Sequence, residues 1–323
     1  MQPGGRECSP SGLRRRVGHP GPAPPGPPYH GGMQTILVTG GGRGLGRVTA
    51  EKLARAGHHV VLHARRPEAA EAASRAIRAA HPAAVVTPHA ADLSSMASVR
   101  ALATEVLGAH QRLDAVLHIA GVMQQSEARR LTPDGFEETL AVNTLAPFLL
   151  TGLLLPALDR SPAARIVNIS SRRHLPDSHG APVDFDLDDP MLERGYDPDR
   201  AYKNSKLAVL WVTYEQARRL AGTPITANAA CPGFVPTTAS DSARGAKRLF
   251  MRTVLVRMPF AVSVDDATDS FVFMATDPAL DGVSGGFYGE QHPIESSPDS
   301  HDAALAARFW ATAERLTGFA WPG

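Results

Sequence analysis

The chain has 323 residues, of which 33 are lysine or arginine and 32 are aspartate or glutamate. This near balance gives no electrostatic argument for a nucleic-acid partner or an acidic membrane surface. Only two cysteines occur, Cys8 and Cys231, which are too few for a disulfide framework and fit a reducing cytoplasm. A chain of this length can bury one large α/β core.

Residues 1–32 differ in composition from the rest of the chain. Eight prolines and eight glycines make up half of this segment, and a run of three arginines lies within it. Such a composition cannot bury enough apolar surface to fold, and the segment lacks the apolar core of a signal peptide. We therefore expect a disordered leader over residues 1–32, with Met33 as a candidate start, followed by one domain over residues 33–323.

From Gln34 onward, short β-rich runs alternate with helical patterns. The runs are nearly continuous in apolar residues, which is typical of strands whose two faces are both covered by helices. This alternation predicts a Rossmann-like, doubly wound parallel α/β sheet in a single domain. The predicted strands are Thr35–Val38, His59–His63, Ala84–Thr87, Ala115–Ile119, Arg165–Ile169, Ile225–Ala230 and Gly286–Tyr288.

The longest apolar stretch of the chain is Leu145–Leu158. It contains two prolines and a threonine within 14 residues. A membrane-spanning helix needs roughly 20 apolar residues. We therefore expect a core helix here and no membrane span.

The first predicted strand leads into a glycine-rich loop, TGGGRGLG at residues 39–46, and a helix follows to about Ala56. Glycines allow a tight turn and let the backbone approach a pyrophosphate, which then lies at the N-terminus of the helix. The strand before the loop and the helix after it are the context that this motif requires. The loop predicts dinucleotide binding.

The end of the second strand bears on the choice of cofactor. An NAD site places a carboxylate there for the ribose 2′-hydroxyl, but no acid occurs before Glu68. Arg65 and Arg66, together with Arg43 in the glycine loop, could instead hold a 2′-phosphate by charge-assisted bonds. The alternative is a pair of exposed arginines at a helix start, which the helix dipole disfavours. We predict NADP(H) in preference to NAD(H).

Tyr202 and Lys206 lie four residues apart in the run AYKNSK, and the chain has only four lysines. On a helix the two side chains share one face. A nearby cation lowers the pKa of a tyrosine by favouring the phenolate, so this pair could exchange a proton with an alcohol or a carbonyl. The alternative is a surface tyrosine beside a solvated lysine.

Seven motifs in order resemble the short-chain dehydrogenase/reductase family over about residues 34–318. Three stretches are most similar to its retinol dehydrogenase-like and protochlorophyllide reductase-like branch: RIVNISSRRH at residues 165–174, YKNSKLAVLW at 202–211 and GFYGEQHPIESSPDSHDAALAARFW at 286–310. One departure is His118-Ile119 where the family has two asparagines, which puts in doubt a side-chain bond between neighbouring strands. Another is the 31-residue gap between Ser171 and Tyr202. The motifs are Thr39-Gly40-xxx-Gly44-x-Gly46, Asp92-Leu93, Ala120-Gly121, Asn143, Ser170-Ser171, Tyr202-xxx-Lys206 and Pro232-Gly233.

The resemblance implies roles for these residues. Ser171 would orient the substrate oxygen, although Ser170 is an alternative, and Tyr202 would transfer the proton. Lys206 would bind the nicotinamide ribose and lower the pKa of the tyrosine, while Asn143 would anchor a water. Asp92 would contact the adenine. The implied cofactor-binding set is Gly40, Gly42, Arg43, Gly44, Leu45, Gly46, Arg65, Asp92, Leu93, Ala120, Gly121, Tyr202, Lys206, Pro232 and Gly233.

These observations favour an NADP(H)-dependent oxidoreductase that transfers hydride to or from a carbonyl or alcohol of a medium-sized hydrophobic substrate, with reduction preferred. An epimerase or dehydratase with retained cofactor and a dinucleotide-sensing regulator stay open as alternatives. No metal site is expected, because the histidines lack ligand spacing and the acidic run Asp184–Asp189 lacks the glycine and closing glutamate of a calcium loop. The expected location is the cytoplasm, and a homo-oligomer is possible.

The substrate pocket is less defined than the cofactor site. The segment 237–260 follows Pro232-Gly233 and alternates cations with apolar residues. It is a candidate substrate lid, and its alternative is a basic amphipathic helix with a solvated face. The other expected walls are Val122, Met123, His174, Leu175, Phe185, Tyr196 and Phe234.

Overall fold

The computed structural model describes residues 32–236 and 261–322 of the chain. The candidate lid and all of the leader except Gly32 lie outside the described residues, so both expectations stay predictions.

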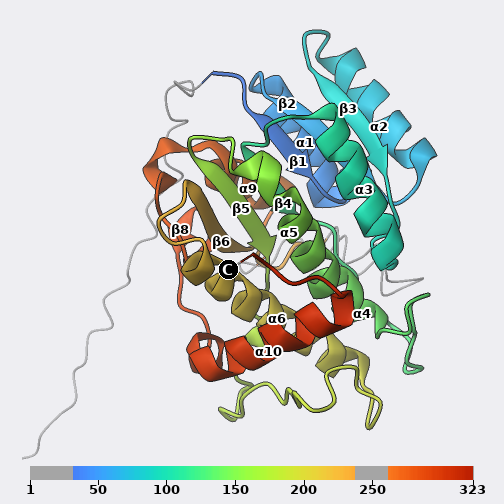
Figure 1. Ribbon diagram of the computed structural model, residues 1–323, viewed down its shortest axis with the longest axis vertical. Helices are drawn as coiled ribbons and strands as arrows, with labels where there is room; N and C mark the ends of the chain where they lie inside the picture. The colour runs from blue at the N-terminus through green and yellow to red at the C-terminus, as the bar shows by residue number, and fades with distance from the viewer. Residues whose placement is uncertain (1–31, 237–260, 323) are drawn as a thin grey trace, which may run out of the picture. The chain divides into compact units, whose positions relative to one another are not determined.

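The described residues form an eight-stranded sheet with the order β3-β2-β1-β4-β5-β6-β7-β8 (Figure 1). All neighbouring strands are parallel except β7 and β8, which are antiparallel. The order reverses direction between β1 and β4, which is the switch point where open α/β sheets bind ligands. The strands are β1 Thr35–Val38, β2 His59–Ala64, β3 Val86–Ala90, β4 Ala115–His118, β5 Ala164–Ile169, β6 Ile225–Cys231, β7 Phe287–Gly289 and β8 His292–Pro293.

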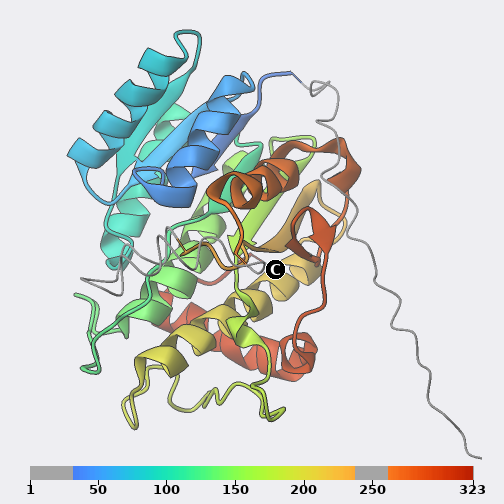
Figure 2. The same ribbon diagram turned by 180° about the vertical axis from the view of Figure 1, so that it is seen from behind.

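Helices cover both faces of this sheet (Figures 1 and 2). One layer contains α1, α2 and α9, and the other contains α3, α5 and α6, with α10 packed against α6. This arrangement confirms the predicted Rossmann-like doubly wound sheet in a single domain. The helices are α1 Gly44–Arg55, α2 Pro67–Ala80, α3 Met96–Ala109, α4 Glu138–Leu140, α5 Ala146–Leu158, α6 Pro198–Arg219, α9 Val264–Thr276 and α10 Ala303–Thr317. Short 3-10 helices are η2 Arg172–His174, η5 Pro278–Leu280 and η6 Pro298–His301.

Strand boundaries agree with the sequence pattern within one residue except at β3. The strand expected at Ala84–Thr87 runs over Val86–Ala90 instead, because Ala84 N–H closes a turn onto the carbonyl of His81. Its Pro88 is tolerated because β3 lies at the edge of the sheet. The antiparallel β8 was not predicted, since a two-residue strand leaves no hydrophobic period to detect.

The apolar stretch continues a helix that begins earlier than expected. Helix α4, the π-helical turn η1 (Ala141–Leu145) and α5 run without a break over Glu138–Leu158, and these 21 residues are long and apolar enough to span a membrane by length and composition alone. The expectation that the stretch is too short was therefore wrong. In the described protein, however, 83% of the apolar window is buried. Phe148, for example, contacts the rings of Trp310 and Trp321.

Candidate active site at the switch point

The glycine loop closes tightly on the start of α1. Gly40 has a φ of +72°, in the left-handed region that favours glycine. A Cβ atom on Gly46 would lie 2.4 Å from the carbonyl oxygen of Gly40, so a side chain at residue 46 would force the loop open. The loop therefore brings its backbone to the first turn of α1 only because both positions are glycine.

The first turn of α1 is suited to an anion. Arg43 precedes the helix in an extended conformation, no side chain caps the helix, and the first turn contains no acidic residue. Among the described residues, neither a capping side chain nor an acid in the first turn offsets the positive end of the helix dipole. Leu45 follows in the first turn and packs partly buried against the apolar cluster beneath α1.

Arg65 lies at the end of β2, where the sequence predicts phosphate recognition. Its Nε and Nη2 atoms donate to Asp92 Oδ2 at 3.1 and 2.9 Å, and the Arg65 side chain is 69% exposed. Burial alone would raise the pKa of Asp92, but hydrogen bonds from Ser94 and the cation of Arg65 outweigh it and lower that pKa. Asp92 thus stays ionised and orients a guanidinium that is still open to solvent.

Leu93, the other half of that motif, has its side chain in the core. It is 6% exposed and packs in the apolar cluster on the α3 side of the sheet. Any contact between this residue and an adenine would therefore have to come from its backbone.

Thr39 connects the two strands on either side of the switch point. Its Oγ1 donates to the carbonyl of Leu117 in β4 at 3.3 Å and accepts the N–H of Ala120 at 3.1 Å. This bond supplies the link between neighbouring strands that the missing asparagines had put in doubt. His118 instead bonds to Thr151 Oγ1 of α5 at 2.7 Å. The sequence pattern includes Thr39 only as part of the glycine motif and does not predict these hydrogen bonds.

Asn143 lies in the π-helical turn between α4 and α5. Its Oδ1 accepts the N–H of Val122 at 2.8 Å, and its Nδ2 donates to the Val122 carbonyl at 2.9 Å and to Ser205 Oγ at 3.0 Å. Ser205 Oγ in turn donates to the carbonyl of Tyr202 at 2.8 Å. Asn143 therefore connects the loop after β4 to the turn of α6 that contains Tyr202 and Ser205. Turns of π-helix often occur at functional sites.

The loop after β4 also brings Gly121 close to the predicted catalytic residues. A Cβ atom on Gly121 would lie 3.3 Å from Asn143 Oδ1 and 3.9 Å from Lys206 Nζ. The structure thus brings together the motifs at Ala120-Gly121, Asn143 and Lys206, which are far apart in the sequence.

Lys206 is buried, with 5% of its surface exposed. Its Nζ donates to the carbonyl of Ile169 at 2.9 Å, and burial lowers its pKa to about 8. Ser170 Oγ donates to the Lys206 backbone carbonyl at 2.8 Å and is itself buried. Because Ser170 is committed to that bond, Ser171 is left as the better candidate for the substrate-binding hydroxyl.

The pKa of Tyr202 is raised, mainly by burial, and a hydrogen bond with the Ser171 side chain offsets part of this effect. Lys206 Nζ lies 5.4 Å from the centre of the Tyr202 ring and points at Ile169. The net pKa shift of Tyr202 is therefore opposite to the expected lowering, because desolvation of the phenolate outweighs the hydrogen bond with Ser171 and the charge of Arg173.

Pro232 and Gly233 follow β6 at the same end of the sheet. Gly233 has a φ of +72°, and a Cβ atom there would lie 2.4 Å from Val262 Cγ2. Its N–H donates to the Sγ atom of Cys231 at 3.4 Å. The turn therefore needs glycine both for its backbone conformation and for its close approach to residue 262.

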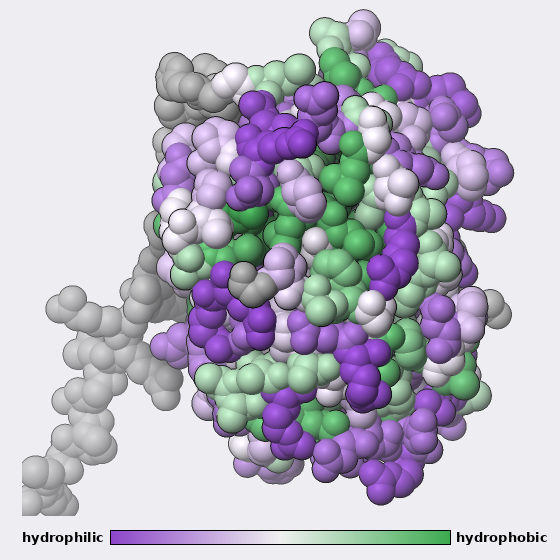
Figure 3. Space-filling view, in the orientation of Figure 1, coloured by the Kyte–Doolittle hydropathy of each residue, from purple (hydrophilic) through white to green (hydrophobic). Residues whose placement is uncertain are grey.

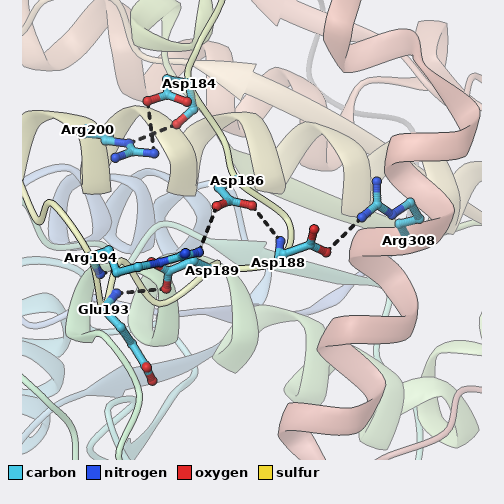
Figure 4. Close-up of polar contacts among 8 residues, drawn as sticks. All are labelled: Asp184, Asp186, Asp188, Asp189, Glu193, Arg194, Arg200 and Arg308. Carbon is cyan, nitrogen blue, oxygen red and sulfur yellow. Dashed lines mark hydrogen bonds and ion pairs between the residues drawn. The ribbon is translucent and has the colours of Figure 1, made fainter.

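The insertion before α6, around residues 181–200, contains an expected pocket wall and the acidic run. Phe185, an expected pocket wall, packs instead on Trp211 and Phe309 in the core, so that expectation was wrong. The acidic run is paired with arginines, and this edge of the molecule carries many hydrophilic side chains (Figures 3 and 4). Within the described residues, no cluster of histidine, cysteine and acidic side chains could hold a metal ion. The pairs are Asp184–Arg200, Asp186–Arg194, Asp189–Arg194 and Asp188–Arg308.

Comparison with known proteins agrees with this geometry. Residues 34–181 match the short chain dehydrogenase family. Human retinol dehydrogenase 14 is 35% identical over 317 residues, covering 94% of this chain and 90% of the relative. Human retinol dehydrogenase 13 is 34% identical over 291 residues, covering 90% and 86%. The chain belongs to the short-chain dehydrogenase/reductase family. Its relatives place it in the retinol dehydrogenase-like branch, and it is an NAD(P)-dependent oxidoreductase that acts on alcohols.

Solved structures of this family have the same fold. An uncharacterized protein of Mycobacterium paratuberculosis is 32% identical with a TM-score of 0.68, covering 90% of this chain and 95% of that one. The RhlG/NADP active-site complex of Pseudomonas aeruginosa is 25% identical with a TM-score of 0.65, covering 81% and 96%.

The residues present fit the dinucleotide that this family uses. The glycine cradle would be filled by a Cβ atom at residue 46, and the uncapped start of α1 favours an anion. The buried ammonium of Lys206, 3.9 Å from the Cβ position of Gly121, offers a donor at the other end of the site. These features fit a pyrophosphate and a ribose, respectively.

Proposed function

We propose that this enzyme is an NADP(H)-dependent reductase of a carbonyl group on a medium-sized hydrophobic substrate. The observation that carries the proposal is the grouping of Ser171, which follows β5, with Tyr202 and Lys206 of α6. Asn143 connects this group of residues to the loop at Gly121, because it hydrogen-bonds to Val122 and to Ser205, which in turn bonds to Tyr202.

In this proposal the nicotinamide supplies the hydride when bound, and the side chains handle the oxygen and its proton. Ser171 hydrogen-bonds the substrate oxygen and orients the carbonyl. Tyr202 gives its proton to that oxygen as the carbon is reduced, which yields the alcohol. Burial keeps the phenol protonated by raising its pKa, and the protonated form is the one that reduction requires. Lys206 donates to the nicotinamide ribose.

The proposed preference for NADP(H) is supported by the charges at the end of β2. Arg65 and Arg66 are exposed there, and the first acid along the chain is Glu68 in the first turn of α2. A 2′-phosphate would meet a guanidinium that Asp92 already orients. The NADP complex of the Pseudomonas aeruginosa structure gives distant support at 25% identity.

The proposed substrate class is supported by the names of the relatives, because retinol is a hydrophobic primary alcohol and several relatives are retinol dehydrogenases. Retinal is therefore the first carbonyl to test. We also propose a cytoplasmic location, which the scarcity of cysteine supports and which cell fractionation of the full chain would test.

A single set of assays tests the proposal. Oxidation of NADPH and of NADH is followed by cofactor absorbance with retinal, medium-chain aldehydes and cyclic ketones, with the Tyr202→Phe variant as the blank. We expect faster turnover with NADPH than with NADH and none above background in the variant. Turnover that is faster with NADH would overturn the cofactor assignment. Release of an epimerised or dehydrated product with no net cofactor oxidation would overturn the reaction.

A further inference from the structure

His63 is buried between the two loops that receive the cofactor. It lies in β2 with 2% of its surface exposed. The N–H of Gly40, in the glycine loop, donates to His63 Nδ1 at 3.3 Å, and His63 Nε2 lies 3.0 Å from the carbonyl oxygen of Ala91. The N–H of Gly41 also donates to the backbone carbonyl of His63 at 2.7 Å.

These partners fix the tautomer of the imidazole ring. The Gly40 N–H can only donate, so Nδ1 must accept and carry no proton. Nε2 then carries the proton and donates to the Ala91 carbonyl, which can only accept. The ring is therefore neutral, and each of its nitrogens has a partner of the opposite kind.

The surroundings favour this neutral form. Burial is the largest influence and lowers the pKa of His63, and the nearby His89 lowers it further. The Ala91 carbonyl and Asp92 act in the opposite direction but do not outweigh burial. His118 of β4 is also close enough to interact with His63 and is itself neutral, because burial lowers its pKa to about 3.

We propose that His63 is a positioning residue that joins the pyrophosphate end and the adenosine end of the dinucleotide site. One end is the loop at Gly40, and the other is the turn at Ala91, which is followed by Asp92 and its partner Arg65. His63 would act through these loops and touch neither cofactor nor substrate. The proposal depends on dinucleotide binding at this site, but it does not depend on which cofactor is preferred.

If His63 joins the two loops, the affinity of the enzyme for NADPH and NADH should depend on the imidazole ring. Loss of the ring removes a tether from both loops, so NADPH and NADH should weaken by a similar factor. The chemical step should be spared, because Tyr202 and Lys206 lie on α6 and are held by bonds to Ser205, Ser170 and Ile169. The Kd of the cofactor should therefore rise while kcat at saturating cofactor stays near the wild-type value.

Three substitutions distinguish the bond between His63 and Gly40 from the bond between His63 and Ala91. His63→Leu removes both, His63→Asn can place an oxygen near Nδ1 to accept from Gly40, and His63→Gln can reach Ala91 instead. A matched control is His89→Gln, since His89 is the register partner of His63 on β3 but bonds to Glu105 outside the two loops. The Kd values of NADPH and NADH are measured by fluorescence titration, and kcat is measured at saturating NADPH.

We expect His63→Leu to raise both Kd values by about tenfold, as for one or two lost hydrogen bonds. His63→Asn and His63→Gln should each recover part of that loss, and His89→Gln should leave both values unchanged. If His63→Leu does not fold, the same comparison is made between the Asn and Gln variants and the wild type.

Unchanged Kd values in His63→Leu, or in both the Asn and Gln variants, would overturn the proposal. So would a loss of kcat as large as the loss of affinity, because His63 would then support the whole domain. Failure of the proposed function gives a different result, since the wild-type chain itself would not reduce carbonyl compounds or would prefer NADH.

Discussion

Charge is handled in opposite ways at Lys206 in α6 and in the insertion that precedes this helix. Lys206 is 5% exposed, and among the described residues its ammonium has a carbonyl as its partner and no carboxylate. In the insertion, by contrast, each aspartate of the run from Asp184 to Asp189 that is drawn in Figure 4 has an arginine partner.

The buried ammonium of Lys206 is a candidate for function, whereas the aspartate–arginine pairs of the insertion are candidates for a structural role. A buried cation without a counter-ion costs folding free energy, and a site that keeps one is a candidate for chemistry. Exposed, paired charges cost little and contribute little. On this argument, changes at Tyr202 and Lys206 should alter activity and leave stability equal or higher, whereas changes in the insertion should alter stability alone.

The sharpest test is Tyr202→Phe. The hydroxyl is expected to act only on the reacting oxygen, so its loss should lower kcat by at least a hundredfold, as is typical for removal of a general acid. The Kd of NADPH and the melting temperature should stay near the wild-type values. The measurements are steady-state turnover, fluorescence titration and thermal unfolding. Near-normal turnover in this variant would remove the proposed mechanism.

Lys206→Met tests whether burial of the Lys206 ammonium lowers the free energy of unfolding of the wild-type protein. The folded pKa is about 8 and the unfolded value is near 10.4. Between these values the unfolded chain binds more protons, so the stability of the wild-type protein should rise as pH increases from about 8 to about 10. This difference between the folded and unfolded pKa of Lys206 corresponds to a free energy of unfolding that is about 3 kcal/mol higher in the variant than in the wild type at neutral pH.

Activity should be lost in the same variant. Denaturant unfolding of wild type and Lys206→Met at pH 7 and at pH 10 measures the difference, which should shrink at the higher pH. A variant that is less stable than the wild type at pH 7 would show that the ammonium stabilises the fold, and the contrast between the two regions would fail.

Arg65→Ala tests an exposed, paired charge that we assign to cofactor binding, unlike the paired charges of the insertion. Loss of a charge-assisted phosphate contact is worth roughly 1.5–3 kcal/mol, or at least about tenfold in affinity for NADPH. NADH should be little affected. The matched control is Arg75→Ala, which removes another exposed arginine that pairs weakly with Glu71 on α2. Equal weakening of both cofactors by Arg65→Ala would make this arginine structural.

The sequence predicts the fold and the outline of the site because both are local signals. Alternating apolar runs define strands, and glycines at residues 40 and 46 define a turn that other residues cannot make. The bonds that hold the site together were not predicted. The hydrogen bonds of His63 and Thr39 join segments that are 28 and 81 residues apart. No pattern in the residues next to His63 or Thr39 predicts these contacts.

The pKa of Tyr202 illustrates a different limit. Spacing alone places Lys206 on the same helix face, but it does not give the direction of the ammonium or the depth of burial. The structure turns Nζ towards the carbonyl of Ile169 and buries the phenol, and this burial raises the pKa of Tyr202. The position of Phe185 was missed for a similar reason, because an aromatic residue in an irregular insertion can face either the pocket or the core.

The smallest expected effects lie in the insertion, at two neighbouring aspartates. Asp189 is buried, and its two oxygens accept the N–H groups of Glu193 and Arg194 at 2.8 and 3.0 Å. Burial would raise its pKa, but these bonds outweigh it and lower the pKa. Asp188 pairs with Arg308 at 3.1 Å, and its side chain is 84% exposed.

We expect Asp189→Asn to cost about 1 kcal/mol, because one amide oxygen keeps only one of the two backbone bonds. Asp188→Asn should change stability by less than about 0.5 kcal/mol, as for most exposed ion pairs. The pKa of Asp189 is lower in the folded state, so its contribution is present above about pH 4 and is lost as pH falls through the folded value. Denaturant unfolding at pH 7 and at pH 3 should therefore show the cost of Asp189→Asn shrinking in acid, with kcat unchanged in both variants. A loss of turnover in either variant would place the insertion in the chemistry and end the contrast with α6.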